Sequence, residues 1–288
     1  MKHLQFILIL FFITACSSTK HNVIKAQKEG AEAPKTNTTI ASKVWHKTTK
    51  QKDTIKTPKN VISSPATTPI KGSIKKPHHK DFNTLLQKYV SKNGLVNYKA
   101  LKTKRAHLLS YITYLGQNTP ENSWSKEDKL AYWINAYNAL TIDLILRHYP
   151  VKSIKDIKKP WERRFWKLGN KWYNLNDIEH NILRKLNEPR IHFAIVCASF
   201  SCPKLSNIAY TASNIDAQLT TATKDFLADA KRNYISKNSI ELSKIFQWFI
   251  KDFKQSGNLI DFLNQYSHVK ISAKARKTYK DYNWSLNE

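Results

Sequence analysis

Two imidazoles and a loop thiol in the second half of the chain can support nucleophilic chemistry. Cys202 lies within Ser201–Pro203, a Ser-Cys-Pro loop in which a thiol can be accessible and can be activated by a nearby imidazole. His192 and His180 are the imidazoles that precede it. A thiol beside an imidazole predicts attack of a thiolate on a carbonyl carbon, which is the chemistry of acyl transfer.

Amide and acid side chains can complete this set. Asn135 and Asn138 share one face of a predicted helix, where they either orient an imidazole or bind the backbone of a neighbouring loop. Glu179 is either an acid–base group or the residue that completes a helix cap begun by Asn176. His180 is either a base or a buried histidine with a satisfied ring.

Several neighbouring residues have binding or structural interpretations. Arg190 can hold a carboxylate through two hydrogen bonds or tie down its own loop, and Ser201 adds a hydroxyl to the same binding region. Alternation along a predicted strand assigns Cys197 to the core, and a disulfide between Cys197 and Cys202 stays open. The His and Cys residues lack the paired spacing of a zinc site, so we expect no metal and no cofactor.

The elements that position these residues have a helix-rich α+β pattern. Ser125 and Asp128 have the spacing of a capping box, and the apolar run 130–146 follows them, which predicts the clearest helix. Residues 177–187 are expected to form a helix capped by Asn176, and residues 190–197 a buried strand. Further helices are expected at 81–90, 215–231, 244–254 and 259–265, and hairpins at 165–173 and 234–242.

The first residues have the pattern of a lipoprotein signal peptide. Lys2 precedes an apolar run, 6–13, that is too short to span a bilayer, for which about 20 residues are needed. The run ends in Ile13-Thr-Ala-Cys16, which resembles a lipobox. We therefore expect residues 1–15 to be removed, Cys16 to carry fatty acids such as palmitate, and the protein to be anchored in the outer membrane facing the periplasm.

Composition changes sharply between the lipobox and the predicted domain. Residues 17–80 contain 14 Lys, three acidic residues and five of the ten prolines. Such a segment buries too little apolar surface to fold, so residues 16–80 are predicted to be a disordered basic tether before a single domain at 81–288. The tether is either a solvated spacer or a contact for an anionic envelope polymer. Export argues against nucleic acid as the partner, despite the net charge of +27.

Five sequence blocks resemble the DUF547 family (domain of unknown function 547). They are AYWINAYNAL at 131–140, LNDIEHNILR at 175–184, PRIHFAIVC at 189–197, SCP at 201–203 and YNWSLN at 282–287. The resemblance covers about residues 82–287, with Asn283 where the family pattern has Asp. It implies no established reaction.

Two functions are therefore expected from the side chains. One is a thiol-dependent amide or peptide hydrolase or acyltransferase. The other is a non-catalytic module that binds a peptide or glycan. The catalytic function requires Cys202, a histidine and an asparagine to lie around one cavity, and the binding function does not.

Overall fold

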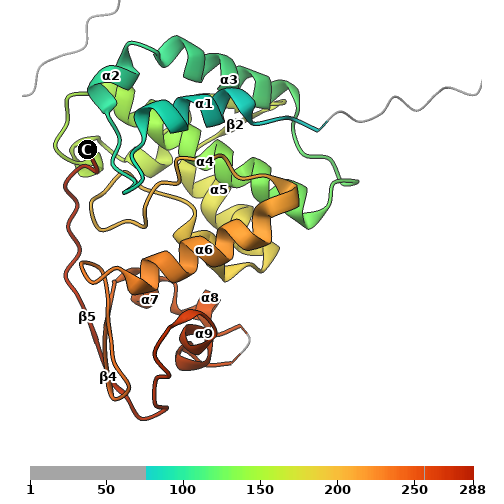
Figure 1. Cartoon of the computed structure of the whole chain (residues 1–288). Helices are drawn as coiled ribbons and strands as arrows, with labels where there is room; N and C mark the ends of the chain where they lie inside the picture. Colours follow the sequence, from blue (N-terminus) through green and yellow to red (C-terminus); the bar gives the residue numbers. More distant parts are fainter. Residues whose placement is uncertain (1–75, 256) are drawn as a thin grey trace, which may run out of the picture. The chain divides into compact units, whose positions relative to one another are not determined.

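The computed structural model describes residues 76–255 and 257–288, and the predicted signal peptide, Cys16 and most of the predicted tether lie outside the described residues. The predicted helix-rich α+β class is confirmed (Figure 1). The helices are α1 (Lys80–Tyr89), α2 (Tyr98–Lys102), α3 (Arg105–Gln117), α4 (Lys126–His148), α5 (Leu175–Asn181), α6 (Ile215–Ala228), α7 (Ile245–Trp248), α8 (Ile250–Phe253) and α9 (Leu259–Tyr266). Among the helices of this described part, none has the length and apolarity needed to cross a membrane.

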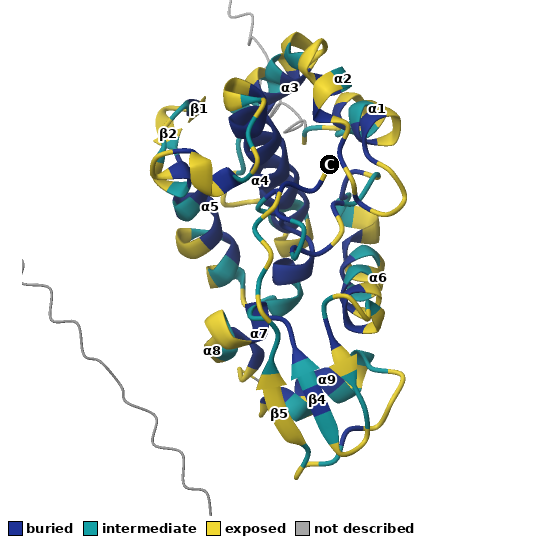
Figure 2. Ribbon diagram, turned by 90° about the vertical axis from the view of Figure 1, so that its left-hand side faces the viewer, coloured by how far each residue is buried: buried dark blue, intermediate teal, exposed yellow. Residues whose placement is uncertain are grey.

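Helix α4 is the centre of the domain. All of its residues from Leu130 to Leu146 are buried, and the predicted capping box of Ser125 and Asp128 is present (Figure 2). Helix α3, which the sequence did not predict, packs beside α4, where the Tyr132 hydroxyl donates to the carbonyl oxygen of Leu115 at 2.8 Å. Because α4 is covered on all sides, it gives the neighbouring loops a rigid support.

The apolar side chains form two clusters. One surrounds α4 and includes α1, α2, α3 and α5. The other is rich in phenylalanine, with Phe193, Phe226, Phe246 and Phe253 among its members. Figure 1 shows α1–α3 at one end of the domain and α8, α9 and strands β4 (Ser239–Leu242) and β5 (Arg276–Tyr279) at the other.

Both predicted hairpins are present. Strands β1 (Trp166–Leu168) and β2 (Lys171–Tyr173) pair through a turn in which Gly169 has a φ of +60°, a conformation that suits glycine. Strands β3 (Tyr234–Ile235) and β4 (Ser239–Leu242) form the second hairpin. Strand β5 (Arg276–Tyr279), which was not predicted, pairs with β4 in the parallel direction.

The predicted strand at 190–197 is wrong. Pro189–Phe193 form a 3-10 helix, and the residues up to Cys197 follow without regular structure. Ile191, Phe193, Ala194 and Val196 are all buried. A short irregular or 3-10 segment that is buried on every side has the same continuous apolar pattern as a buried strand. The hydrophobic pattern therefore does not distinguish these conformations.

Helix α5 begins earlier than predicted, and its cap is Asn174, not Asn176. The Asn174 side chain accepts a hydrogen bond from the backbone of Asp177 at 2.7 Å, and the two residues form a capping box. The helix ends at Asn181 and continues as a 3-10 helix over Leu183–Leu186. Both asparagines are good caps with an acidic residue three positions on, Asp177 for Asn174 and Glu179 for Asn176, so the sequence pattern does not distinguish them. Helix α6 ends at Ala228, before the predicted 231.

The two ends of the described chain pack on the domain. The C-terminal segment, residues 282–287, lies between two distant parts of the sequence, since Ser285 pairs with Ser153 and Leu286 with Ser199. At the other end, the His79 ring nitrogen Nδ1 lies 2.7 Å from the Tyr111 hydroxyl, so contacts with the domain start before the predicted boundary at residue 81.

Candidate functional site

A cavity of about 230 Å³ lies where the two apolar clusters meet. Its lining includes four of the eight site residues predicted in the domain: Glu179 and His180 from α5, His192 from the 3-10 helix Pro189–Phe193, and Cys202. Cys197, which was predicted to be a core residue, lines it as well. The cavity therefore brings together thiols, imidazoles and a carboxyl group that are far apart in the sequence.

The two cysteines are free thiols in contact with each other. Their sulfur atoms lie 2.7 Å apart. Cys202, predicted to be exposed in its loop, is buried, whereas Cys197, predicted to be a core residue, is half-buried. The prediction that Cys197 is a core residue relied on the alternation of a strand at 190–197, and this segment is not a strand.

The sulfur of Cys202 is surrounded by hydrogen-bond donors. The backbone N–H of Cys197 donates to it at 3.1 Å, the Ser199 hydroxyl donates at 3.2 Å, and the Tyr282 hydroxyl lies at 3.2 Å. Burial raises the pKa of the Cys202 thiol, but the hydrogen bonds from Cys197, Ser199 and Tyr282 outweigh burial and lower it to about 6. The pKa of Cys197 is raised by its hydrogen bond to Cys202 and by burial. The hydrogen bonds therefore favour Cys202 as the sulfur that carries the thiolate, while Cys197 keeps its proton more readily.

The loop between the cysteines has a strained backbone. Ala198 has a φ of +58°, in the left-handed region that a residue with a Cβ disfavours. The backbone N–H of Asn287 donates to the Ala198 carbonyl oxygen at 3.2 Å, and Ser199 pairs with Leu286. The C-terminal segment thus holds the cysteine loop in a conformation that turns both sulfur atoms to one place.

Glu179 is a buried carboxyl group at the same cavity. Its Oε2 accepts a hydrogen bond from the Tyr137 hydroxyl at 3.1 Å. Burial raises the pKa of Glu179 to about 7, although the Tyr137 hydrogen bond works in the other direction. Glu179 does not close a helix cap, since Asp177 has that role. An acid that is half-protonated near neutral pH is suited to give and take protons.

The histidines bind a carboxylate and an arginine instead of the thiols. His192 Nε2 lies 2.8 Å from Asp252 Oδ2, and Arg184 binds both oxygens of Asp252 at 2.6 and 2.8 Å. Burial lowers the pKa of His192, which the Asp252 hydrogen bond opposes. His180 Nδ1 lies 3.1 Å from Arg184. Within the described residues, no hydrogen bond joins an imidazole to a thiol.

Asp252 and Tyr282 are site residues that sequence reasoning missed. Asp252 lies in a short helix that looked like an ordinary amphipathic element, and nothing in its surroundings signals a pairing with His192. Tyr282 could have been found, because it opens the last of the five sequence blocks.

Aromatic rings form the outer wall of the cavity. Tyr282 and Trp284 have ring centres 4.5 Å apart. Trp248 stacks on Trp284 at 5.8 Å and is tilted against Tyr282 at 4.8 Å. Trp161 meets the edge of Trp284 at 5.9 Å. Because Trp248 is 46% exposed, this wall reaches the surface.

Asn135 and Asn138 hold backbone and do not line the cavity. Asn135 exchanges two hydrogen bonds with the backbone of Tyr210, at 2.7 and 3.0 Å. Asn138 donates to the Ala194 carbonyl oxygen at 2.9 Å and accepts from the Val196 N–H at 3.0 Å. Asn138 thus fixes the backbone that leads into Cys197 and replaces the strand pairing that the sequence predicted.

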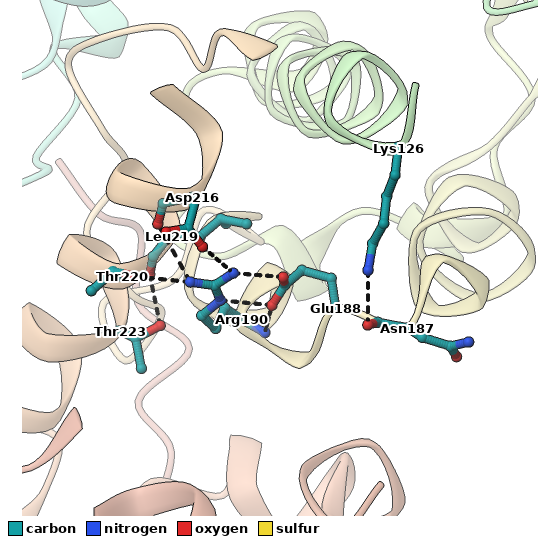
Figure 3. Close-up of polar contacts among 8 residues, drawn as sticks. All are labelled: Lys126, Asn187, Glu188, Arg190, Asp216, Leu219, Thr220 and Thr223. Carbon is teal, nitrogen blue, oxygen red and sulfur yellow. Dashed lines mark hydrogen bonds and ion pairs between the residues drawn. The ribbon is translucent and has the colours of Figure 1, made fainter. Parts of the chain in front are cut away.

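Arg190 and Ser201 also lie apart from the cavity. Figure 3 shows the Arg190 guanidinium between Glu188 and α6; it donates to both Glu188 oxygens at 2.7 Å and to the Thr220 hydroxyl at 2.8 Å. The Ser201 hydroxyl accepts a hydrogen bond from the Asn283 N–H at 2.9 Å. Both residues tie down loops, and the donors of Arg190 are occupied by the protein itself.

Among the described residues, 76–255 and 257–288, no three His, Cys, Asp or Glu side chains form a cluster that could bind a metal ion. What the cavity offers is a thiol whose thiolate is stabilised, a carboxyl group that is half-protonated near neutral pH, and an imidazole paired with a carboxylate. These groups can form and break a bond to an acyl carbon.

The fold and the cavity define a helix-rich α+β domain with a thiol pair in an aromatic-lined site. Residues 121–227 match the family described as "Protein of unknown function, DUF547", which confirms the resemblance over that segment. The match includes Glu179, His192 and both cysteines, whereas Asp252 and Tyr282 lie beyond it. No curated protein and no solved structure matches the chain.

Proposed function

We propose that this chain is a lipoprotein anchored in the outer membrane whose domain is a thiol-dependent amide or peptide hydrolase or acyltransferase. The observation that supports this most directly is the Cys202 sulfur, which lies in a cavity and is stabilised as a thiolate by several donors. Burial alone raises the pKa of a thiol, so the lowered pKa of Cys202 reflects the donors around its sulfur.

The cavity groups suit the two half-reactions of acyl transfer. The Cys202 thiolate attacks the carbonyl carbon, a C–S bond forms, and the leaving amine departs with a proton supplied by neutral Glu179. The resulting thioester is then attacked by water or an acceptor amine, whose proton returns to Glu179 while the thiolate leaves. A group with a pKa of about 7 can act in both directions.

His192 has a supporting place in this scheme. With its Nε2–H directed at Asp252, the Nδ1 of His192 is an acceptor. Because His192 lines the same cavity as the thiols, its Nδ1 is proposed to accept a hydrogen bond from the attacking nucleophile. Asp252 orients the imidazole, a role that the sequence analysis assigned to Asn135 or Asn138. Arg184 keeps Asp252 ionised, because its hydrogen bonds outweigh the effect of burial and lower the pKa of that carboxyl group.

The second candidate function is a binding module for a peptide or glycan. The clustered rings of Trp248, Tyr282 and Trp284 at the mouth favour it, because aromatic faces supply contact area at little entropic cost.

Trapping of an acyl-enzyme separates the two functions. The full chain carrying Cys16→Ser, in which Cys197 and Cys202 are the remaining thiols, is mixed with p-nitrophenyl acetate. We expect a burst of p-nitrophenolate and an acetyl group on Cys202 by mass spectrometry, both lost in Cys202→Ala. Tyr282→Phe should raise the pH at which the burst is half-maximal, because it removes a donor from the thiolate.

Two controls accompany this measurement. Tyr234→Phe removes a hydroxyl from a residue that is 58% exposed and outside the cavity, so it should leave the pH profile unchanged. His180→Gln should also leave it unchanged, since no imidazole contacts the sulfur within the described part. An unaltered burst in Cys202→Ala, or none in the parent protein, would leave only the binding function.

A further inference from the structure

A segment of the chain that contributes to the cavity mouth is rich in lysine and arginine. Residues 152–171, here called the basic segment, contain eight lysines and arginines and only two acidic residues, Asp156 and Glu162. The lysines of the segment, at 152, 155, 158, 159, 167 and 171, are all exposed.

Few of these charges are neutralised by the protein. Lys159 pairs with Glu162, and Arg164 pairs with Asp177. Within the described residues, Lys155 and Lys158 form no ion pair with a carboxylate. Unpaired cations grouped on one surface raise the local positive potential and attract anions from solution.

The basic segment is attached to the cavity wall itself. Trp161, which belongs to the segment, lines the cavity. The Lys155 ammonium group lies 4.4 Å from the centre of the Trp284 ring, which also lines it. The Leu286 N–H donates to the Lys152 carbonyl oxygen at 2.9 Å, which fixes the segment beside the C-terminal segment that contains Trp284.

The carboxyl groups at the cavity do little to offset this charge. Glu179 is neutral through much of the range below pH 7, and Asp252 is compensated by Arg184. An anionic ligand that enters between the tryptophans therefore meets a positive field at the mouth and an apolar wall within.

We infer that the cavity takes an acyl donor with an anionic group, a carboxylate or a phosphate, placed beyond the reacting carbonyl so that it lies against Lys155 and Lys158. This inference rests on the proposed function for the acyl transfer itself. The acyl portion packs between the aromatic rings, and the anion stays at the rim.

Matched activated esters test the inference on the full chain carrying Cys16→Ser. The p-nitrophenyl esters share one chain length and end in a carboxylate, a phosphate, a methyl ester or a trimethylammonium group. We expect the two anionic esters to acylate Cys202 about tenfold faster than the methyl ester at low salt, with the preference largely lost at 0.5 M NaCl. The rates of the carboxylate and phosphate esters show which anion fits better.

Two double variants of equal net charge locate the effect. Lys155→Gln with Lys158→Gln should remove most of the anion preference, measured as the ratio of the rates for an anionic ester and the methyl ester in the same variant. Lys224→Gln with Lys237→Gln, which changes exposed lysines outside the cavity lining, should keep the preference.

The outcomes separate this inference from the proposed function. Equal rates for all four esters at low salt would overturn the inference and leave the thiol chemistry intact. Absence of any acylation would reject the thiol chemistry, and anion binding is then measured by tryptophan fluorescence with a non-reactive glutarate monoanilide. Quenching that disappears in the Lys155/Lys158 variant would support the anion site, and no quenching in the parent would reject it.

Discussion

Glu179 is a carboxylic acid placed where its charged form is poorly solvated. Its pKa is raised from 4.5 to about 7 by burial, so the folded chain binds a proton that the unfolded chain releases. The stability linked to this proton is therefore fully present below about pH 4.5 and is lost as the pH rises through about 7. The size of the shift corresponds to roughly 3 kcal/mol.

Glu179→Gln should remove this pH dependence, because glutamine keeps the shape of the side chain without an ionisable proton. The free energy of unfolding in urea, measured between pH 4.5 and 8.5, should fall with pH in the parent protein more steeply than in the variant. Glu121→Gln, at an exposed position, is the control and should retain the parental slope. Parallel curves for parent and Glu179→Gln would show that Glu179 is ionised throughout.

Residue-level reasoning from the sequence found the chemical groups but not their partners. The thiols, Glu179 and His192 were identified from their types and positions. The contacts that decide their roles come from residues far along the chain, since Tyr282 is 80 residues after Cys202 and Asp252 is 60 residues after His192. Sequence spacing contains no information about such contacts.

At the level of elements, Asn138 connects the central helix to the cysteine loop. Asn138→Ala should lower the free energy of unfolding by about 1–3 kcal/mol, because it leaves the Ala194 carbonyl and the Val196 N–H buried without partners. It should also slow the acylation of Cys202, since Val196 precedes Cys197 directly. Urea unfolding and the p-nitrophenolate burst measure the two effects.

Asn135→Ala is a matched control from the same helix face. It should destabilise the domain by a similar amount through the Tyr210 backbone, yet leave acylation of the folded protein close to that of the parent. If both variants reduced acylation equally, the effect would be a general loss of stability and not a loosening of the cysteine loop.

The elements differ in how well the sequence predicted them. Helix α4 and both hairpins have complete local signals, a capping box with a long apolar run and glycine or asparagine turns. The segment 190–197 lacks such signals. Its backbone hydrogen bonds are made with the Asn138 side chain and within a 3-10 turn, and not with neighbouring strands. Strand β5 depends on pairing with β4, which is more than thirty residues earlier in the chain.

For the whole molecule, the proposed anchor gives the clearest prediction. Cys16→Ala should leave a longer precursor that incorporates no labelled palmitate, because both lipidation and processing need that thiol. The measurement is the intact mass together with fatty-acid labelling of the membrane fraction. Cys197→Ala is the control and should be labelled like the parent. Label entering Cys16→Ala would contradict the lipoprotein assignment.

The C-terminal segment also makes the site depend on two parts of the chain that are far apart in the sequence. Tyr282 lies 3.2 Å from the Cys202 sulfur, and Leu286 pairs with Ser199 in the cysteine loop. Cys202 is synthesised 80 residues before Tyr282. In the proposed mechanism, the thiol therefore gains the contacts that favour its thiolate only after residues 282–287 have been added and have packed on the cysteine loop.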